Sequence, residues 1–330
     1  MPRPRRSEEM IVQVARMRYE QRLPQTEIAR SLDVSEATVS RCLKAALDLG
    51  FVEIQVAPKA FRDVVTERRL KLHLGLKLAV VVEDRPNPAQ AIDTLGKAFA
   101  RVLEDMMKPG DVIGVSDGAT TAAIAAAARR APSTDVDVVS LVGGLGAPEQ
   151  FSHSSEVCRR LAGGLGARAW QLPVPAIVDD DNAARMLHDT AAIRAVFQLM
   201  ERMTIAVVGV GAISPDATIF REGFIDHTFM QAIRQRGAVG TICARFFGLG
   251  GTPVGTGFDD RTMSISLDDL KRAPMRIAVA ISPDKAEAIR AAVDGGLINA
   301  IATDAVTARA LMAHPHMVEE AARAYPTTTT

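Results

Sequence analysis

Two stretches of the sequence place polar side chains at spacings that suit specific chemistry. In Gln25 to Leu43, hydroxyl, amide and cationic side chains alternate with small apolar ones. In Ser116 to Thr121, a run of Ser, Asp, Gly and Thr residues lies between an apolar run and an alanine-rich run. The first stretch suits hydrogen bonds to a nucleic acid. The second suits a ligand held where a strand ends and a helix begins.

The first stretch has the spacing of a helix-turn-helix. Such a motif packs two helices steeply across a tight turn, so it needs a small residue at the crossing and apolar residues on both inner faces. Ala29 is the small residue, and the apolar positions are filled by Ile28, Leu32, Val34, Val39 and Cys42. We expect helices over 8–19, 25–32 and 36–47. Asp33 takes the turn position, which Asp tolerates because it adopts left-handed backbone more readily than most residues.

The outer side of this motif predicts contacts with DNA bases and phosphates. The predicted DNA-binding residues are Gln25, Thr26, Ser35, Glu36, Ala37, Thr38, Ser40, Arg41 and Lys44. The charge of the N-terminal part also suits a nucleic-acid partner. Residues 1–72 carry 14 Lys and Arg against 10 Asp and Glu, although the whole chain has a net charge of zero. A helical bundle that contacts only protein stays open as an alternative. The alternation in Phe51 to Val56 predicts a strand that would serve as a wing.

Beyond residue 74 the sequence alternates apolar runs with helical segments. The expected strands are 78–82, 112–115, 136–142, 167–172, 205–210, 239–243, 276–281 and 300–303. The expected helices are 88–107, 120–130, 155–161, 183–200, 229–235, 284–293 and 304–312. Strands that are apolar throughout indicate a parallel sheet covered on both faces, and hence an α/β fold. Ligands of such sheets bind beyond the carboxyl ends of the strands.

Glycine and hydroxyl residues gather at those strand ends. Gly118, Thr120 and Thr121 open a helix and suit a phosphate, and Gly143 and Gly144 follow the next strand. The sequence lacks the GxGxxG and GxxxxGK[ST] patterns, so dinucleotide and nucleoside triphosphate ligands lose support. The spacing around a lysine at position 285 favours an ordinary solvated side chain over a ligand contact.

Composition excludes several classes of function. The three cysteines lie far apart, and the six histidines show no metal spacing, so we expect no disulfide framework, no metal site and no cofactor. The sequence shows neither a catalytic triad order nor paired carboxylates in a catalytic context, and we predict no catalytic residues. Apolar stretches are too short to span a bilayer, and the N-terminus is not a secretory signal, so we expect a cytoplasmic protein.

Several motifs, in order, resemble those of the SorC family of sugar-binding bacterial transcriptional regulators, and the resemblance covers nearly the whole chain. The head of the chain is similar in QTEIA at 25–29, in VS at 34–35 and in TVSR at 38–41. The rest is similar in PGDVIGV at 109–115, IAVVGVG at 205–211, GAVG at 237–240 and GGLIN at 295–299, and in Lys285 with Ala288 and Ile289.

The resemblance implies a winged helix-turn-helix followed by an effector domain with the fold of sugar-phosphate isomerases and CoA transferases, without catalysis. It implies domains over 1–57 and 75–315, a linker helix over 58–74 and a C-terminal tail over 316–330. It places Gly118, Thr120 and Thr121 on a phosphate loop, Lys285 on an effector contact, and His153 where an amide side chain is common. The implied partners are operator DNA, a small carbohydrate effector and further copies of the chain, as a dimer or tetramer.

The effector class stays open between a sugar, a sugar phosphate and a polyol. The family commonly has an aromatic residue and Gly where this chain has Ser116 and Asp117, and an acidic residue where it has Thr241. An alternative function is a sugar-phosphate isomerase-like enzyme with a DNA-binding appendage. A third is a metabolite-binding protein whose N-terminal helices contact only protein.

Overall fold

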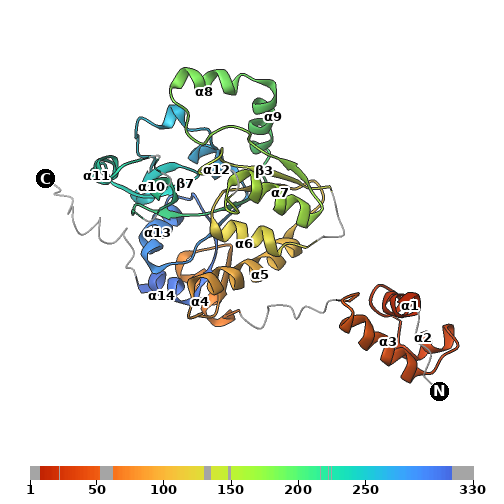
Figure 1. Cartoon of the computed structure of the whole chain (residues 1–330). Helices are drawn as coiled ribbons and strands as arrows, with labels where there is room; N and C mark the ends of the chain where they lie inside the picture. The colour runs from red at the N-terminus through yellow and green to blue at the C-terminus, as the bar shows by residue number, and fades with distance from the viewer. Residues whose placement is uncertain are drawn as a thin grey trace. The chain divides into compact units, whose positions relative to one another are not determined.

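A computed structural model describes residues 8–313, apart from 22, 53–61, 130–134, 148–149, 216, 222 and 224. The chain divides into two compact units, residues 1–57 and 58–330. We call them the head and the body, and Figure 1 shows both. Most of the expected wing over 51–56 and the expected tail over 316–330 lie outside the described residues.

The head contains three helices, α1 (Glu8–Tyr19), α2 (Gln25–Ser31) and α3 (Glu36–Asp48). Their apolar faces form one small core in which Ile28, Val39 and Cys42 are fully buried. The turn between α2 and α3 contains Asp33 with a φ of 50°, so the predicted left-handed conformation is confirmed. Ser35 caps α3 by accepting a 3.2 Å hydrogen bond from the Thr38 amide, as its residue type predicts.

The centre of the body is a seven-stranded parallel sheet with the strand order β1-β10-β9-β5-β2-β3-β4. In chain order the strands are β1 (Leu78–Val82), β2 (Val112–Val115), β3 (Asp137–Ser140), β4 (Arg168–Trp170), β5 (Ile205–Val208), β9 (Met275–Val279) and β10 (Ala300–Asp304). Central strands are buried on both faces, which explains their continuous apolar runs. All seven lie at positions expected from the sequence.

Helices cover both faces of this sheet (Figure 1). One buried cluster packs the sheet against α5 (Pro88–Met106), α6 (Ala119–Ala127) and α7 (Ser154–Leu165). The other packs its opposite face against α4 (Val64–Leu74), α9 (Ala191–Met200), α12 (Leu267–Arg272), α13 (Ala286–Asp294) and α14 (Ala305–Ala313). The fold is therefore the three-layered α/β type that the sequence predicts.

A second sheet of three strands corrects one expectation. The expected strand over 239–243 is β7 (Ala238–Ile242), which pairs antiparallel with β6 (Gly211–Ala212) and β8 (Arg245–Gly248) and does not join the parallel sheet. Beside it lie two short helices, α10 (Thr218–Arg221) and α11 (His227–Gln235). The expected single helix over 183–200 is two helices, α8 (Asp181–His188) and α9, because a new helix starts after Thr190.

The order of the strands creates a switch point between β2 and β5. From β2 the chain continues to β3 and β4 on one side, whereas from β5 it continues to β9 and β10 on the other. The loops that leave β2 and β5 therefore diverge at the carboxyl ends of these two neighbouring strands. In open parallel sheets, ligands bind at such a switch point.

Candidate functional site

The head presents most of its predicted DNA-binding residues to solvent. Ser35, Glu36, Ala37, Ser40, Arg41 and Lys44 are exposed along α3 and its cap, and Thr26 is exposed on α2. Gln25 and Thr38 are half-buried. The structure thus brings the predicted set together on α3 and the start of α2, the two helices that the turn at Asp33 connects.

Arg41 is held against its own helix. Its Nε donates a 2.9 Å hydrogen bond to the carbonyl oxygen of Ala37, and Nη2 lies 3.4 Å from Oγ1 of Thr38. Both partners are exposed or half-buried, so the guanidinium remains at the surface. It can exchange these weak contacts for a base edge or a phosphate with little loss.

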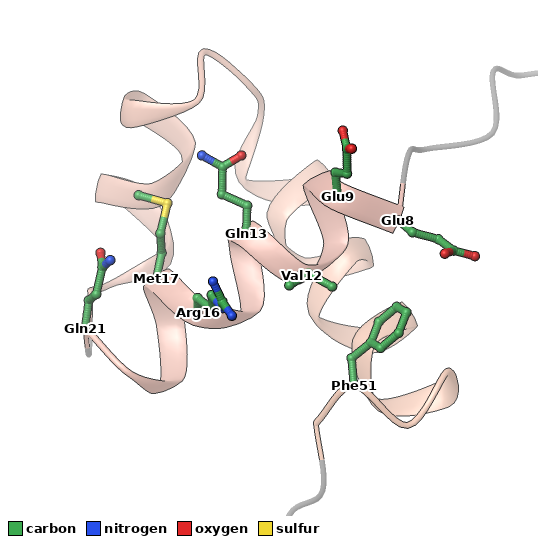
Figure 2. A pocket seen from close by; sticks show the side chains of 8 residues that line it. All are labelled: Glu8, Glu9, Val12, Gln13, Arg16, Met17, Gln21 and Phe51. Atoms are coloured by element: carbon green, nitrogen blue, oxygen red, sulfur yellow. The ribbon is translucent and has the colours of Figure 1, made fainter.

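A groove on the outer face of α1 is a different surface. Figure 2 shows the side chains that line this cavity of about 670 Å³, which come from α1, from Gln21 and from Phe51 after α3. Glu8 and Glu9 stand at one end of it, and Arg16 and Met17 lie further along the helix. Because two carboxylates flank it, the groove is unsuited to a phosphate backbone.

In the body, Ser116 connects the two loops at the switch point. Its hydroxyl oxygen accepts a 2.9 Å hydrogen bond from the Gly209 amide, after β5, and the hydroxyl donates to the carbonyl oxygen of Asp117 at 3.0 Å. The residue is 1% exposed. Ser116 therefore holds the loops that follow β2 and β5 together at the switch point.

Gly118 begins α6 with a φ of 117°, a conformation in which a side chain would be strained. The hydroxyl of Thr120 donates to the carbonyl oxygen of Val279, at the end of β9, at 2.9 Å. The hydroxyl of Thr121 donates to the carbonyl oxygen of Gly118 at 2.8 Å. The loop is thus prearranged by the protein, and the dipole of α6 favours negative charge at this end of the helix.

Lys285 lies on the neighbouring loop, which leaves β9. It is the last residue of a short 3-10 helix, Pro283–Lys285, and immediately precedes α13. The side chain is half-buried, and burial lowers the pKa of its ammonium. Within the described part of the chain the ammonium has no hydrogen-bond or ion-pair partner. Ser282, at the start of this loop, has a φ of 129°, which is strained for a residue other than Gly.

Gly143 and Gly144 use their amides within the protein. The Gly143 amide donates to the carbonyl oxygen of Met263, and the Gly144 amide to that of Val174 at 2.8 Å. A Cβ on Gly144 would lie 2.5 Å from Nε2 of His153, so any larger residue here would displace the His153 ring. The two glycines therefore let other segments, and the buried His153 ring at the start of α7, approach closely.

The structure describes the surroundings of Asp117, which the sequence marks as a departure from the family's common pattern. Although part of its surface is accessible, surrounding protein atoms desolvate the carboxyl and raise its pKa to about 6. Apart from its own backbone amide, the carboxyl has no hydrogen-bond or ion-pair partner among the residues that the structure describes. Acidic residues are common just before helices. Asp117 differs from an ordinary one in that its carboxyl lacks a side-chain or ion-pair partner among the described residues.

A strained turn faces this carboxyl. Cys243 and Ala244 join β7 to β8 with φ angles of 49° and 60°, a left-handed pair that normally requires Asn or Gly. Burial raises the pKa of the Cys243 thiol, and the charge of Asp117 raises it further. Next to the turn, Arg245 donates to the carbonyl oxygen of Thr262 at 2.7 Å and to Oγ of Ser264 at 3.1 Å. The turn is thereby attached to the segment over 259–264.

None of the described helices is long and apolar enough to cross a membrane. Across the same residues, His, Cys, Asp and Glu side chains form no group with the geometry of a metal site.

Comparison with protein families gives two matches. Residues 59–313 match the family described as "Putative sugar-binding domain". Residues 12–48 match the family described as sigma-70, region 4, a match that covers the helix-turn-helix of the head.

Individual relatives are similar over nearly their full length. The chain is 30% identical to the deoxyribonucleoside regulator of Bacillus subtilis, over 93% of this chain and 98% of the relative. It is 29% identical to the sorbitol operon regulator of Klebsiella pneumoniae, over 92% of this chain and 97% of the relative. The crystal structure of the full-length sorbitol operon regulator SorC from Klebsiella pneumoniae superposes with a TM-score of 0.76 at 25% identity, covering 94% of this chain and all of that one.

Proposed function

The chain belongs to the SorC family of sugar-binding transcriptional regulators, and from this premise we propose that a small carbohydrate bound at the switch point of the body controls binding of the head to operator DNA. The family consists of regulators and not enzymes, which speaks against the isomerase-like alternative. The helix-turn-helix match likewise favours a DNA partner over a purely protein-binding head.

The observation that carries the effector site is a contact between the loop that follows β2 and the end of β9. Gly118, Thr120 and Thr121 start α6, and Thr120 is hydrogen-bonded to the end of β9. Lys285, whose ammonium has no partner within the described residues, follows that same strand. A half-buried cation without a partner is costly to keep, so we assign it to the effector.

We assign the remaining predicted residues supporting roles in this site. Gly144 leaves room for the His153 ring at the start of α7, and the amides of Gly143 and Gly144 are engaged by the protein. The amide of Gly118 donates to the carbonyl oxygen of Ser152, which brings the residue before His153 to the start of α6. His153 is therefore the member of this group that we expect to contact the effector.

The effector class we propose is a small carbohydrate. The names of the relatives point to sorbitol, a polyol, and to deoxyribonucleosides, whose sugar is a pentose. Both compounds carry hydroxyl groups, which match the hydroxyl, carboxylate and ammonium groups of the proposed site. A phosphorylated sugar and a neutral polyol are both compatible with this class.

On the head we propose that Arg41 and Lys44 contact bases or phosphates and that Ser35, Thr38 and Ser40 face the groove. The second helix of such a motif lies in the major groove. Thr26 and Gln25, at the start of α2, suit phosphate contacts, because that end of the motif meets the backbone. Glu36 and Ala37 lie at the start of α3, the part of a recognition helix closest to base edges.

We propose a symmetric homo-oligomer, a dimer or tetramer, because one helix-turn-helix reads too few base pairs for genomic specificity. The exposed side of α4 supports this proposal. Val65 and Leu72 lie seven residues apart on α4 and are 71% and 75% exposed, and Val64 is 65% exposed. Large apolar side chains gathered on one helix indicate a protein contact. We assign this regulator to the cytoplasm, where its DNA partner is accessible.

The proposed function is tested by anisotropy of a labelled DNA fragment from upstream of the protein's own operon, titrated with full-length protein and a carbohydrate panel. We expect nanomolar binding in moderate salt and a large change with one carbohydrate. The same compound at a hundred times its dissociation constant should stabilise the protein by about 2.7 kcal/mol. Stabilisation without any change in DNA affinity would contradict control of the operator by this site.

A further inference from the structure

The start of α6 already contains an anionic group that belongs to the protein. Asp117 directly precedes Gly118, the N-cap residue of α6. A carboxylate there interacts favourably with the helix dipole, so it fills the electrostatic role that a ligand phosphate would take. This placement raises the question of which ligand group can share the position.

The surroundings of Asp117 do not neutralise it. Three other elements with titratable groups lie around Asp117 and the start of α6. The charge of Asp117 acts on the Cys243 thiol in the strained turn, and the Gly118 amide donates to the carbonyl oxygen of Ser152, next to His153. The Thr120 hydroxyl donates to the carbonyl oxygen of Val279, at the strand end that leads to the loop with Lys285. None of these groups forms a hydrogen bond or an ion pair with the Asp117 carboxyl in the described structure. The carboxyl is therefore free to accept hydrogen bonds from a ligand.

We propose that Asp117 makes the effector site select an uncharged, hydroxyl-bearing group at the start of α6 and reject a phosphate there. This inference rests on the proposed function, because it assigns the ligand class of the same site. An ionised carboxylate only accepts hydrogen bonds, so it pairs with hydroxyl donors of a sugar or polyol. Two anions within a few ångströms in a desolvated site strongly disfavour one another.

The ammonium of Lys285 is compatible with this selection. Its three donors can bind hydroxyl oxygens of a neutral ligand as well as phosphate oxygens. A single cation cannot compensate both the carboxylate and a doubly charged phosphate. The combination of one acceptor side chain and one donor side chain fits a polyol, whose hydroxyls both donate and accept.

Sulfate is a suitable probe for the selection, because it mimics a phosphate group and stays doubly charged across the pH range in which Asp117 titrates. Binding to full-length protein is measured by calorimetry at constant ionic strength, at about pH 5 and about pH 8. The variants are Asp117→Asn, Lys285→Met and Asp93→Asn. The last is a matched control that removes a negative charge from the exposed side of α5.

We expect the unmodified protein to bind sulfate weakly at the higher pH and at least tenfold more tightly at the lower pH, where Asp117 takes up a proton. Asp117→Asn should bind sulfate at least tenfold more tightly than the unmodified protein at the higher pH and lose most of the pH dependence. Asp93→Asn should behave like the unmodified protein. Lys285→Met should weaken the sulfate binding of the Asp117→Asn background.

Each contrary result has a distinct meaning. Equal sulfate affinity of the unmodified protein and Asp117→Asn, with weakening by Lys285→Met, overturns the selection by Asp117 and leaves the proposed site intact. A pH dependence that persists in Asp117→Asn also overturns it, because the proton is then taken up by a group other than Asp117. If neither Asp117→Asn nor Lys285→Met changes sulfate binding, the proposed site itself is wrong.

Discussion

One carboxylate oxygen of Glu67, on α4, accepts a 3.0 Å hydrogen bond from the backbone amide of Val81, on the edge strand β1. The same carboxylate binds the Arg62 guanidinium through two contacts of 2.7 Å. Glu67 is 7% exposed, so this group is a nearly buried connection between the first described segment of the body and its sheet. Any displacement of α4 must therefore also affect β1.

We predict that Glu67→Ala destabilises the body by roughly 2 to 4 kcal/mol, because it leaves a half-buried guanidinium and a buried amide without partners. The midpoint and slope of urea unfolding measure this loss. Glu67→Gln keeps an acceptor for the Val81 amide and should lose less. Asp93→Ala, which removes an exposed pair with Lys97, should change stability by about 0.5 kcal/mol or less. Equal losses in all three variants would refute the role of the connection.

On the head, Arg41→Ala should weaken operator binding by roughly 1 to 3 kcal/mol if the guanidinium reads a base. Lys44→Ala should weaken binding to all DNA sequences alike. It should also reduce the slope of log affinity against log salt concentration by about one. Arg16→Ala is the matched control, since Arg16 lines the groove on the outer face of α1 (Figure 2). Anisotropy titrations at several salt concentrations separate the three. A larger loss in the control than in Arg41→Ala would place the DNA surface on α1.

Lys285→Met should abolish the effector response while operator binding without effector is kept, because the lysine belongs to the body. Burial lowers the pKa of this ammonium in the folded protein, so below its unfolded pKa the charge costs stability. The variant should therefore be no less stable than the unmodified protein near neutral pH. DNA binding with and without the effector, together with urea unfolding, tests both parts. Loss of DNA binding with intact effector affinity would show that the site is misplaced.

Asp117 should make the protein less stable as pH rises. Its pKa is about 6 when folded against an ordinary value of 3.8, so the folded state holds the proton more tightly than the unfolded chain. Stability from this group is complete below about pH 4, falls as pH rises to about 6 and stays low above it. The free energy of unfolding of Asp117→Asn should thus exceed that of the unmodified protein by roughly 1 to 3 kcal/mol above pH 6, and the two should be equal below pH 4. Urea midpoints at several pH values measure the difference, and a gain that is independent of pH would contradict this explanation.

The exposed side of α4 should mediate self-association. Leu72→Lys places a charge in the proposed contact, and we expect it to shift the sedimentation coefficient toward a smaller species. Met186→Lys on α8, a residue 65% exposed, is the matched control and should leave the assembly unchanged. Operator affinity should fall with assembly, because both half-sites must be bound together. An unchanged assembly in Leu72→Lys would exclude this face.

The parallel sheet was predictable because its strands are buried on both sides. Such strands need continuous apolar runs, and the runs at 78–82 and 112–115 match β1 and β2 residue for residue. The second sheet was not predictable to the same degree. Strand β8 follows Cys243 and Ala244, a turn that contains neither Asn nor Gly, so the hairpin has no local sequence signal.

The candidate site was only partly predictable for a similar reason. Gly118, Thr120 and Thr121 directly follow a predictable strand, so their position at its carboxyl end could be inferred. The use of the Gly143 and Gly144 amides depends on Met263 and Val174, which come from distant parts of the chain. The missing partners of Asp117 and Lys285 are also a property of the folded surroundings and not of any short motif.

The pairing of β1 with β10 has a consequence for synthesis on the ribosome. In chain order these are the first and last strands of the parallel sheet. In space they are neighbours, and each of the five residues of β1 pairs with one of β10. A growing chain therefore cannot complete the sheet until residues 300–304 have emerged. The three helices of the head make short-range contacts and can form much earlier. During most of its synthesis, the head of this regulator is therefore expected to be folded before the body can respond to any metabolite.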